Sequence, residues 1–387
     1  MSPRSIAAEV KPELLRWARE TAGLEVSRIA RRFRKVENWE RGVERPTVRQ
    51  LETLSDLYKR PLAAFFLPFP PAEPPPPTDF RVLPGDERRT LSKRLRLAMR
   101  KARRTQRLYA ELAEELAIAH APGLPRVSLP ADAETHAGKL RRLTGVSIEE
   151  QSSWVDGYEA FRKWRSTLEA IGVFVMQLSM PVKEARGVSL SEGPMPTIVV
   201  NSSDAIQARI FTLFHELVHL LLNSGGICIP DPTALVEPSQ QVEQFCNHFA
   251  GAFLVPLDAL YSQPDLLQLP SAPRELDDRL GIAARAFKVS RQVILRRLLV
   301  AGTISREQFR QTMNRWLSSE PPLQRKGGGQ RPAAKTISQL GAGFVSLVVE
   351  AHSRGVIHSG DVADYLSLNL KYLPELLRLV STQPHGQ

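Results

Sequence analysis

A pair of histidines with a glutamate beside the first of them is the part of this chain most suited to chemistry. The pattern His-Glu-x-x-His occupies His215, Glu216 and His219. On a helix, residues four apart lie nearly one above the other, so both imidazoles face one metal ion. Glu216 then reaches a water in the metal's open position. The spacing predicts a zinc hydrolase centre, with Mn²⁺ as the alternative ion.

The residues around this pattern indicate a buried helix, because they are apolar nearly all round. They are Phe211, Leu213, Phe214, Leu217, Val218, Leu220, Leu221 and Leu222. Polar groups are costly to bury there without a ligand. The competing interpretation is a chance match in a core helix, which we expect in roughly one chain in a hundred.

Catalytic zinc needs a third protein ligand. A second helical pattern follows at residues 242–256, and Glu243 at its start is the predicted ligand. The alternatives nearby in sequence are His248, Cys246, Glu237 and Asp231. His248 lies on a different side of the helix from Glu243, and Cys246 is interpreted as a small buried residue.

These two stretches resemble the ImmA/IrrE family of metallopeptidases. The resemblance rests on Phe-Thr-Leu-Phe-His-Glu-Leu-Val-His-Leu-Leu-Leu, followed by Glu-x-x-x-Asn-x-Phe-Ala-x-x-Phe-Leu-x-Pro, between Asn201 and Pro256. It implies zinc on His215, His219 and Glu243, with Glu216 activating the water. It also implies a cytoplasmic protein whose substrate is a repressor of the helix-turn-helix class.

Composition agrees with a protein of the cytoplasm. Apolar residues make up 42% and charged residues 24% of the chain, as in ordinary soluble proteins. No run is long enough for a membrane span, and no apolar signal segment begins the chain. Two cysteines cannot build a disulfide framework. The net charge of +11 is concentrated in the N-terminal third, since residues 81–107 carry eleven Lys/Arg and two Asp/Glu.

Residues 1–67 are predicted to form a small helical domain that resembles the lambda-repressor-like (XRE-type) helix-turn-helix. Compared with that pattern, the stretch between Ala30 and Trp39 is about four residues short, roughly one helical turn. The missing part includes the start of the recognition helix. The remaining basic residues are candidates for phosphate contacts: Arg31, Arg32, Arg34 and Lys35. A helical docking module with a solvated basic face is the alternative.

A proline-rich spacer at residues 68–77 separates this domain from a helical scaffold predicted over 78–170. The long helix of the scaffold, from Leu91 to Ile118, carries a dense basic stripe. Such a stripe suits nucleic acid or an acidic partner. We favour the alternative, a solvated helix whose Lys and Arg stems lie on the core.

The peptidase core is predicted over residues 171–260. Three short β-runs at 173–178, 185–190 and 197–201 predict a small antiparallel sheet before the His-Glu-x-x-His helix. An edge strand of such a sheet pairs with an extended substrate. The run containing Gly187 is our choice for that edge.

The rest of the chain is predicted to be helical, which makes the fold class α+β. Residues 261–320 contain a second helix-turn-helix-like run with Ser290 as N-cap, whose Arg291, Arg296 and Arg297 permit nucleic-acid contact. A flexible linker at 321–335 precedes a C-terminal helical segment at 336–387.

Two functions compete. The first is a zinc endopeptidase that cleaves a helix-turn-helix repressor and switches on a stress or mobile-element response. The second is a DNA-binding transcriptional regulator, or an antitoxin-like protein, whose metal is structural or sensory. Glu216 favours the first, and the basic N-terminal third favours the second.

Overall fold

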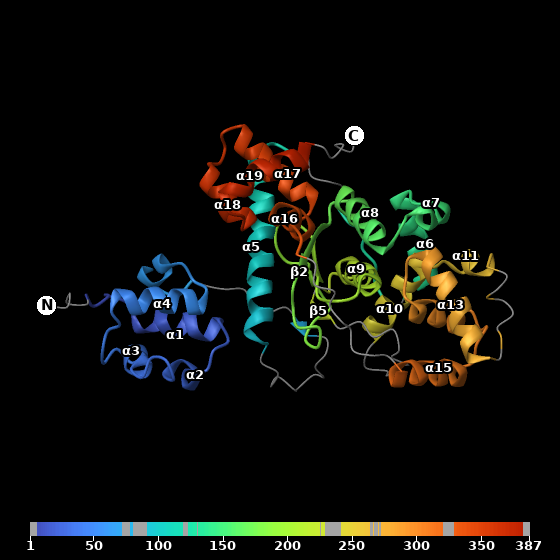
Figure 1. Cartoon of the computed structure of the whole chain (residues 1–387), viewed down its shortest axis with the longest axis horizontal. Helices are drawn as coiled ribbons and strands as arrows, with labels where there is room; N and C mark the ends of the chain where they lie inside the picture. The colour runs from blue at the N-terminus through green and yellow to red at the C-terminus, as the bar shows by residue number, and fades with distance from the viewer. Residues whose placement is uncertain are drawn as a thin grey trace. The chain divides into compact units, whose positions relative to one another are not determined.

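The computed structural model divides the chain into two compact units, which are described separately (Figure 1). One comprises residues 1–76 and 82–101, and the other 77–81 and 102–387. The structure describes residues 6–71, 78–79, 91–118, 123–129, 131–224, 226–228, 241–263, 266, 270, 272–319 and 329–381. The predicted proline-rich spacer is described only as far as residue 71, and the predicted linker at 321–335 only from residue 329.

The N-terminal unit is a set of short helices around one core. They are α1 (Pro12–Thr21), α2 (Val26–Ala30), α3 (Val36–Glu40), α4 (Val48–Tyr58) and the 3-10 helix η1 (Leu62–Phe66). Proline stands in the first turn of α1, and Gly23 follows the helix at a positive φ of 66° that favours glycine. Between α1 and α4 the chain forms two five-residue helices, α2 and α3, and the comparison of this stretch with a helix-turn-helix stays a prediction.

The start of helix α5 (Lys93–Glu115) supplies basic side chains to this unit. Lys93 Nζ donates to the carbonyl of Leu57 at 2.6 Å, and Arg100 donates to the carbonyls of Lys59 and Thr21 at 3.1 and 3.2 Å. These carbonyls lie at the C-terminal ends of α4 and α1, where helices present unsatisfied acceptors. Lys93 and Arg100, two residues of the basic stripe, thus have a structural role in this unit.

The second unit contains a five-stranded sheet in the order β1-β5-β3-β4-β2. The strands are β1 (Thr78–Asp79), β2 (Phe174–Leu178), β3 (Gly187–Leu190), β4 (Thr197–Asn201) and β5 (Gly226–Cys228). The sheet is mixed, because β2 runs parallel to β4 and β1 parallel to β5, while β3 is antiparallel to both its neighbours. The prediction of an antiparallel sheet is therefore wrong. The segment between β2 and β4 is long enough to carry the chain back for a parallel pairing.

The prediction that the Gly187 strand forms an edge is also wrong. Strand β3 lies inside the sheet, because β5 pairs with it through Gly187↔Cys228 and Val188↔Ile227. The outer strand on that side is β1, and β2 is the outer strand on the other. Strands of two and three residues leave little local signal, since their pairing is made by residues far apart in sequence.

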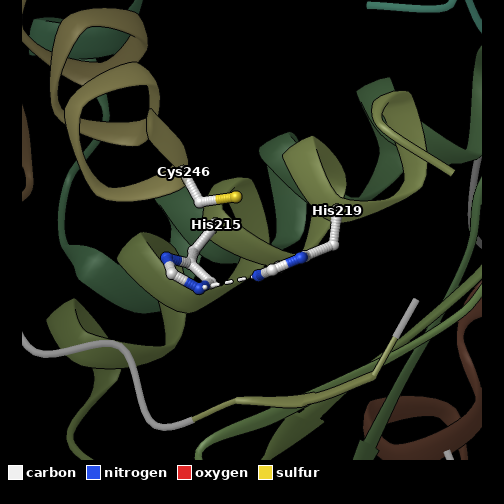
Figure 2. Close-up of side chains that lie close together, drawn as sticks. All are labelled: His215, His219 and Cys246. Carbon is white, nitrogen blue, oxygen red and sulfur yellow. Dashed lines mark hydrogen bonds between the residues drawn. The ribbon is translucent and has the colours of Figure 1, made fainter. Parts of the chain in front are cut away.

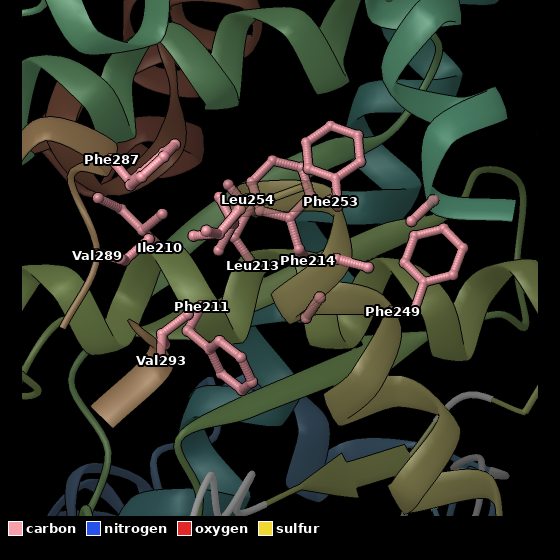
Figure 3. Packing of buried hydrophobic residues seen from close by; sticks show 14 of the residues in the cluster. Ile210, Phe211, Leu213, Phe214, Phe249, Phe253, Leu254, Phe287, Val289 and Val293 are labelled. Carbon is pink, nitrogen blue, oxygen red and sulfur yellow. The ribbon is translucent and has the colours of Figure 1, made fainter. Parts of the chain in front are cut away.

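The helices of this unit that precede the C-terminal segment pack on the sheet or on one another. They are α6 (Ala133–Thr144), α7 (Ile148–Ser153), α8 (Gly157–Ala170), α9 (Ile206–Leu221), α10 (Gln241–Leu254), α11 (Leu257–Tyr261), α13 (Pro273–Phe287), α14 (Arg291–Val300) and α15 (Arg306–Ser319). Helix α9 lies at the centre of the main core and packs on β3 and β4. Figure 3 shows Leu213 and Phe214 of this helix among apolar side chains from α10, including Phe253. The rings of Phe214 and Phe253 stack at 4.2 Å between centroids.

The C-terminal segment is helical, as predicted. It contains α16 (Pro332–Leu340), α17 (Ala342–Ser353), α18 (Ser359–Leu366), η3 (Leu370–Tyr372) and α19 (Leu373–Ser381). Helix α16 begins at Pro332, so the last residues assigned to the flexible linker are helical. Arg165 and Gln177 both donate to the carbonyl of Ser338, at 2.9 and 3.0 Å, which attaches this segment to α8 and β2. Among the described residues, no helix combines the length and hydropathy needed to cross a membrane.

Candidate metal centre

Helices α9 and α10 bring the three predicted metal ligands to one point. The Nε2 atoms of His215 and His219 lie 3.2 Å apart. The Glu243 carboxylate of α10 lies 3.3 Å from His215 Nε2 and 3.1 Å from His219 Nε2. Both histidines are fully buried, and the side chain of Glu243 is 16% exposed. Three donor groups therefore face one another at nearly equal distances.

These distances fit a tetrahedral metal ion. Nitrogen and oxygen ligands lie about 2.0–2.1 Å from zinc, so two ligands of a tetrahedral site lie about 3.3 Å from each other. The separations of 3.1–3.3 Å among His215, His219 and Glu243 agree with that value. Three protein ligands are the number found in catalytic zinc sites, whereas structural sites have four.

Each imidazole is oriented through its other ring nitrogen. His215 Nδ1 lies 3.1 Å from Asn247 Oδ1, and His219 Nδ1 lies 3.2 Å from Ser224 Oγ. With Nδ1–H donating to these oxygens, both Nε2 atoms present lone pairs to the same point, which a cation between them would stabilise. Asn247 and Ser224 were not predicted as site residues. The Asn in Glu-x-x-x-Asn was a usable signal, because it lies one turn after Glu243.

Cys246 is a rival third ligand. Its sulfur and the two histidine nitrogens all lie within 4.8 Å of one another, and Figure 2 shows the thiol close to the facing imidazoles. Burial raises the pKa of the Cys246 thiol well above its usual value, and the neighbouring Glu243 adds to this effect. A cysteine binds a metal as the thiolate, so a thiol with a raised pKa is poorly suited to metal binding at neutral pH.

Glu243 is better prepared to bind a metal. Burial acts to raise the pKa of its carboxyl, but the adjacent imidazoles of His215 and His219 outweigh burial and hold that pKa well below its usual range. The group is therefore a carboxylate at neutral pH, already in contact with both imidazoles. We therefore take Glu243 as the candidate third ligand, with Cys246 also close to the two histidines.

Glu216 lies on the side of α9 that faces β3. It is fully buried, and the strand approaches it at Gly187. A Cβ at Gly187 would lie 2.4 Å from Glu216 Oε1 and 2.6 Å from the Cγ2 of Thr212. Only glycine fits between this strand and the helix. A glycine inside a strand pattern signals such an approach, but the sequence prediction gave Gly187 a different role.

His248 binds elsewhere and does not compete at this point. His248 Nε2 lies 2.7 Å from a carboxylate oxygen of Glu134, on a side of α10 away from Glu243. Asp231 and Glu237 lie outside the described residues.

The predicted nucleic-acid contacts divide into two groups. Arg31, Arg32, Arg34 and Lys35 are exposed in the turns between α2 and α3, where Lys35 pairs with Glu44 at 2.7 Å. In the second helix-turn-helix-like run, Ser290 caps α14 as predicted. Arg297 is buried, with 1% exposure, and pairs with Glu134, so its predicted availability to nucleic acid is wrong. The sequence marked its charge but not that it faces the core.

Comparison with known proteins gives one match. Residues 168–299 match the family model of the IrrE N-terminal-like domain, a peptidase family designated M78. The match covers β2 to most of α14 and includes the two histidines, Glu216 and Glu243, which makes this region a metallopeptidase-type domain. No curated protein and no solved structure matches the chain. The helix-turn-helix resemblance of the N-terminal unit has no matching family model.

Proposed function

We propose that this protein is a zinc-dependent endopeptidase of the ImmA/IrrE type that acts in the cytoplasm. In this proposal His215, His219 and Glu243 hold the metal, and Glu216 is the general base. The substrate is a helix-turn-helix transcriptional repressor, and its cleavage switches on a stress or mobile-element response. The family match over residues 168–299 supports the peptidase chemistry.

The observation that carries the proposal is the convergence of three donors at 3.1–3.3 Å beside a buried glutamate. A structural zinc site has four protein ligands, whereas this set leaves room for a water or substrate. When bound, zinc supplies a Lewis acid and lowers the pKa of water towards neutrality.

Other residues of the chain orient the metal ligands and transfer the proton. Asn247 and Ser224 hold the imidazoles in the orientation that ligation needs. Glu216 accepts the proton of the attacking water and returns it to the amine of the departing peptide. The contact of α9 with Gly187 fixes the position of that carboxylate, and a general base acts only within hydrogen-bonding reach.

The test is cleavage of candidate helix-turn-helix repressors by the full-length protein, with Zn²⁺ or Mn²⁺ added. Glu216→Gln keeps the size of the side chain and removes the base. We expect the variant to retain its metal and to lose cleavage by at least about 100-fold. A variant as active as wild type would refute the role of Glu216.

A second candidate function is DNA-binding regulation with a structural or sensory metal. The exposed basic residues Arg31, Arg32, Arg34 and Lys35 of the N-terminal unit favour it. Tight, salt-dependent binding to operator DNA, with Glu216→Gln as effective as wild type and no repressor cleaved, would support this function over the first.

A further inference from the structure

We infer that Glu134 of α6 is a positioning residue for the metal centre, acting through His248 and Arg297 to fix the rotation of α10 about its axis. The inference rests on the proposed function. It concerns how Glu243 is held in place when it belongs to a helix other than the one that carries the two histidines.

Glu134 binds two partners with its carboxylate. Arg297 of α14 donates to both oxygens, at 2.5 and 2.9 Å, and His248 of α10 lies 2.7 Å from Oε1. Burial acts to raise the pKa of Glu134, but its hydrogen bonds with His248 and Arg297 outweigh burial and lower that pKa to about 2. Glu134 is therefore a carboxylate at neutral pH, and its hydrogen bond with His248 of α10 is charge-assisted.

Arg297 also binds α10 directly. Its Nε donates to the carbonyl of Val255, just beyond the C-terminal end of that helix, at 2.7 Å. Its stem passes Gly251 of α10, where a Cβ would lie 3.3 Å from Arg297 Cδ. The guanidinium thus connects the end of α10 to the carboxylate that binds its flank.

The position of the His248 contact on α10 allows it to resist rotation of that helix about its axis. Glu243 and Asn247 are four residues apart and share the face of α10 towards α9. His248 lies five residues beyond Glu243, about 140° round the helix. A contact on that flank resists turning, whereas a cap on a terminal carbonyl lies near the axis and resists it little.

The metal centre is sensitive to such a turn. The Glu243 carboxylate lies about 6 Å from the helix axis, so a rotation of about 10° moves it about 1 Å. Metal–ligand distances tolerate about 0.2 Å. A small loss of restraint on α10 therefore weakens the metal site before it unfolds the helix.

Glu134 lies outside residues 168–299, the part of the chain that matches the peptidase family. Helix α6, which carries it, packs along α10. The family region supplies the ligands and Arg297, and the preceding helix supplies the carboxylate that joins Arg297 to His248.

The test measures metal affinity of the full-length protein with Zn²⁺, by chelator competition, and with Co²⁺, whose visible absorption reports tetrahedral coordination. Loss of an outer partner of a metal site weakens binding about 10- to 100-fold. We expect about 10-fold weaker binding for Glu134→Gln and a loss of similar size for His248→Ala, which removes the contact on the flank of α10 but keeps the pair of Glu134 with Arg297. The side chain of His248 is only half-buried, which makes this second variant well suited to fold.

Arg141→Met provides the matched control. Arg141 of α6 is another buried arginine, and it donates to the carbonyl of Phe253 near the end of α10 at 2.7 Å, but it makes no ion pair with Glu134. We expect this variant to lower Tm and leave the Zn²⁺ affinity unchanged.

The possible outcomes separate the two ideas. Equal Zn²⁺ and Co²⁺ affinities in wild type and both Glu134→Gln and His248→Ala would overturn the inference and leave the proposed function standing. Absence of metal binding by wild type would overturn the proposed function and the inference with it.

Discussion

The substitution Gly187→Ala tests the catalytic geometry with a single methyl group. The new Cβ would lie 2.4 Å from Glu216 Oε1 and 2.7 Å from its Cγ. Ordinary contacts of a Cβ begin at 3.4 Å, so strand and carboxylate must separate by about 1 Å. Because β3 is paired on both sides, we expect the glutamate to move more than the strand.

The expected loss follows from the displacement. A misplacement of about 1 Å at a reacting group lowers the rate about 100-fold, or about 2.7 kcal/mol in activation free energy. The metal ligands on α9 are not in the clash, which involves Glu216 and Thr212. Metal affinity is therefore expected to stay within a few-fold of wild type while kcat falls.

The assay compares kcat, Zn²⁺ affinity and Tm of the variant with those of wild type and of Gly138→Ala. Gly138 lies in α6, where an added Cβ meets nothing closer than 3.7 Å, and alanine favours the helix. The control should keep full activity. A Gly187→Ala protein with normal kcat and normal metal content would refute the assignment of Glu216 as a base held by β3.

Three further changes follow from the same contacts. Asn247→Leu removes the acceptor for His215 and is expected to weaken Zn²⁺ binding about 10- to 100-fold in a chelator competition, while Asn247→Asp, a charged acceptor, binds at least as tightly. The pKa of Glu134 is lowered from 4.5 to about 2, so the stability that this carboxylate contributes is present above pH 4.5 and lost as the pH falls towards 2. The Tm of the metal-free wild type should therefore drop more between pH 6 and pH 3 than the Tm of Glu134→Gln. Arg165→Met leaves the partly buried Glu169 without the arginine beside it and removes a donor to the carbonyl of Ser338. We expect a loss of about 3 kcal/mol in the free energy of unfolding, measured in urea. A Tm difference that stays constant with pH, or an Arg165→Met protein as stable as wild type, would count against these assignments.

Much of the secondary structure could be predicted from local patterns in the sequence. The β-branched runs predicted strands close to the observed β2, β3 and β4, and Ser290 marked the start of α14. The direction and order of the strands were not predictable in the same way, because they depend on pairings between distant residues such as Val175 with Ile198. Strands β1 and β5 were missed for the same reason, since neither is long enough to show an alternating pattern.

The metal centre shows the same division between local and distant information. The i, i+4 spacing of His215 and His219 on a helix brings their Nε2 atoms to 3.2 Å, so that half of the site followed from the sequence. Glu243 was a harder prediction, because its place depends on how α10 packs against α9. That packing is set by residues with no part in the chemistry: Gln151 donates to the carbonyl of Leu254 at 3.0 Å, as Arg297 does to that of Val255.

Buried polar residues satisfy the last carbonyls of α10 and so determine where that helix can end inside the core. A helix that ends inside a core leaves its last carbonyls without water, and each must find a donor. Arg141, Gln151 and Arg297 provide donors to three consecutive carbonyls. Burying two guanidinium groups is costly unless they are bound in this way, so their positions and that of α10 determine one another. A motif of ligands alone could not reveal this dependence, because the donors come from α6, α7 and α14.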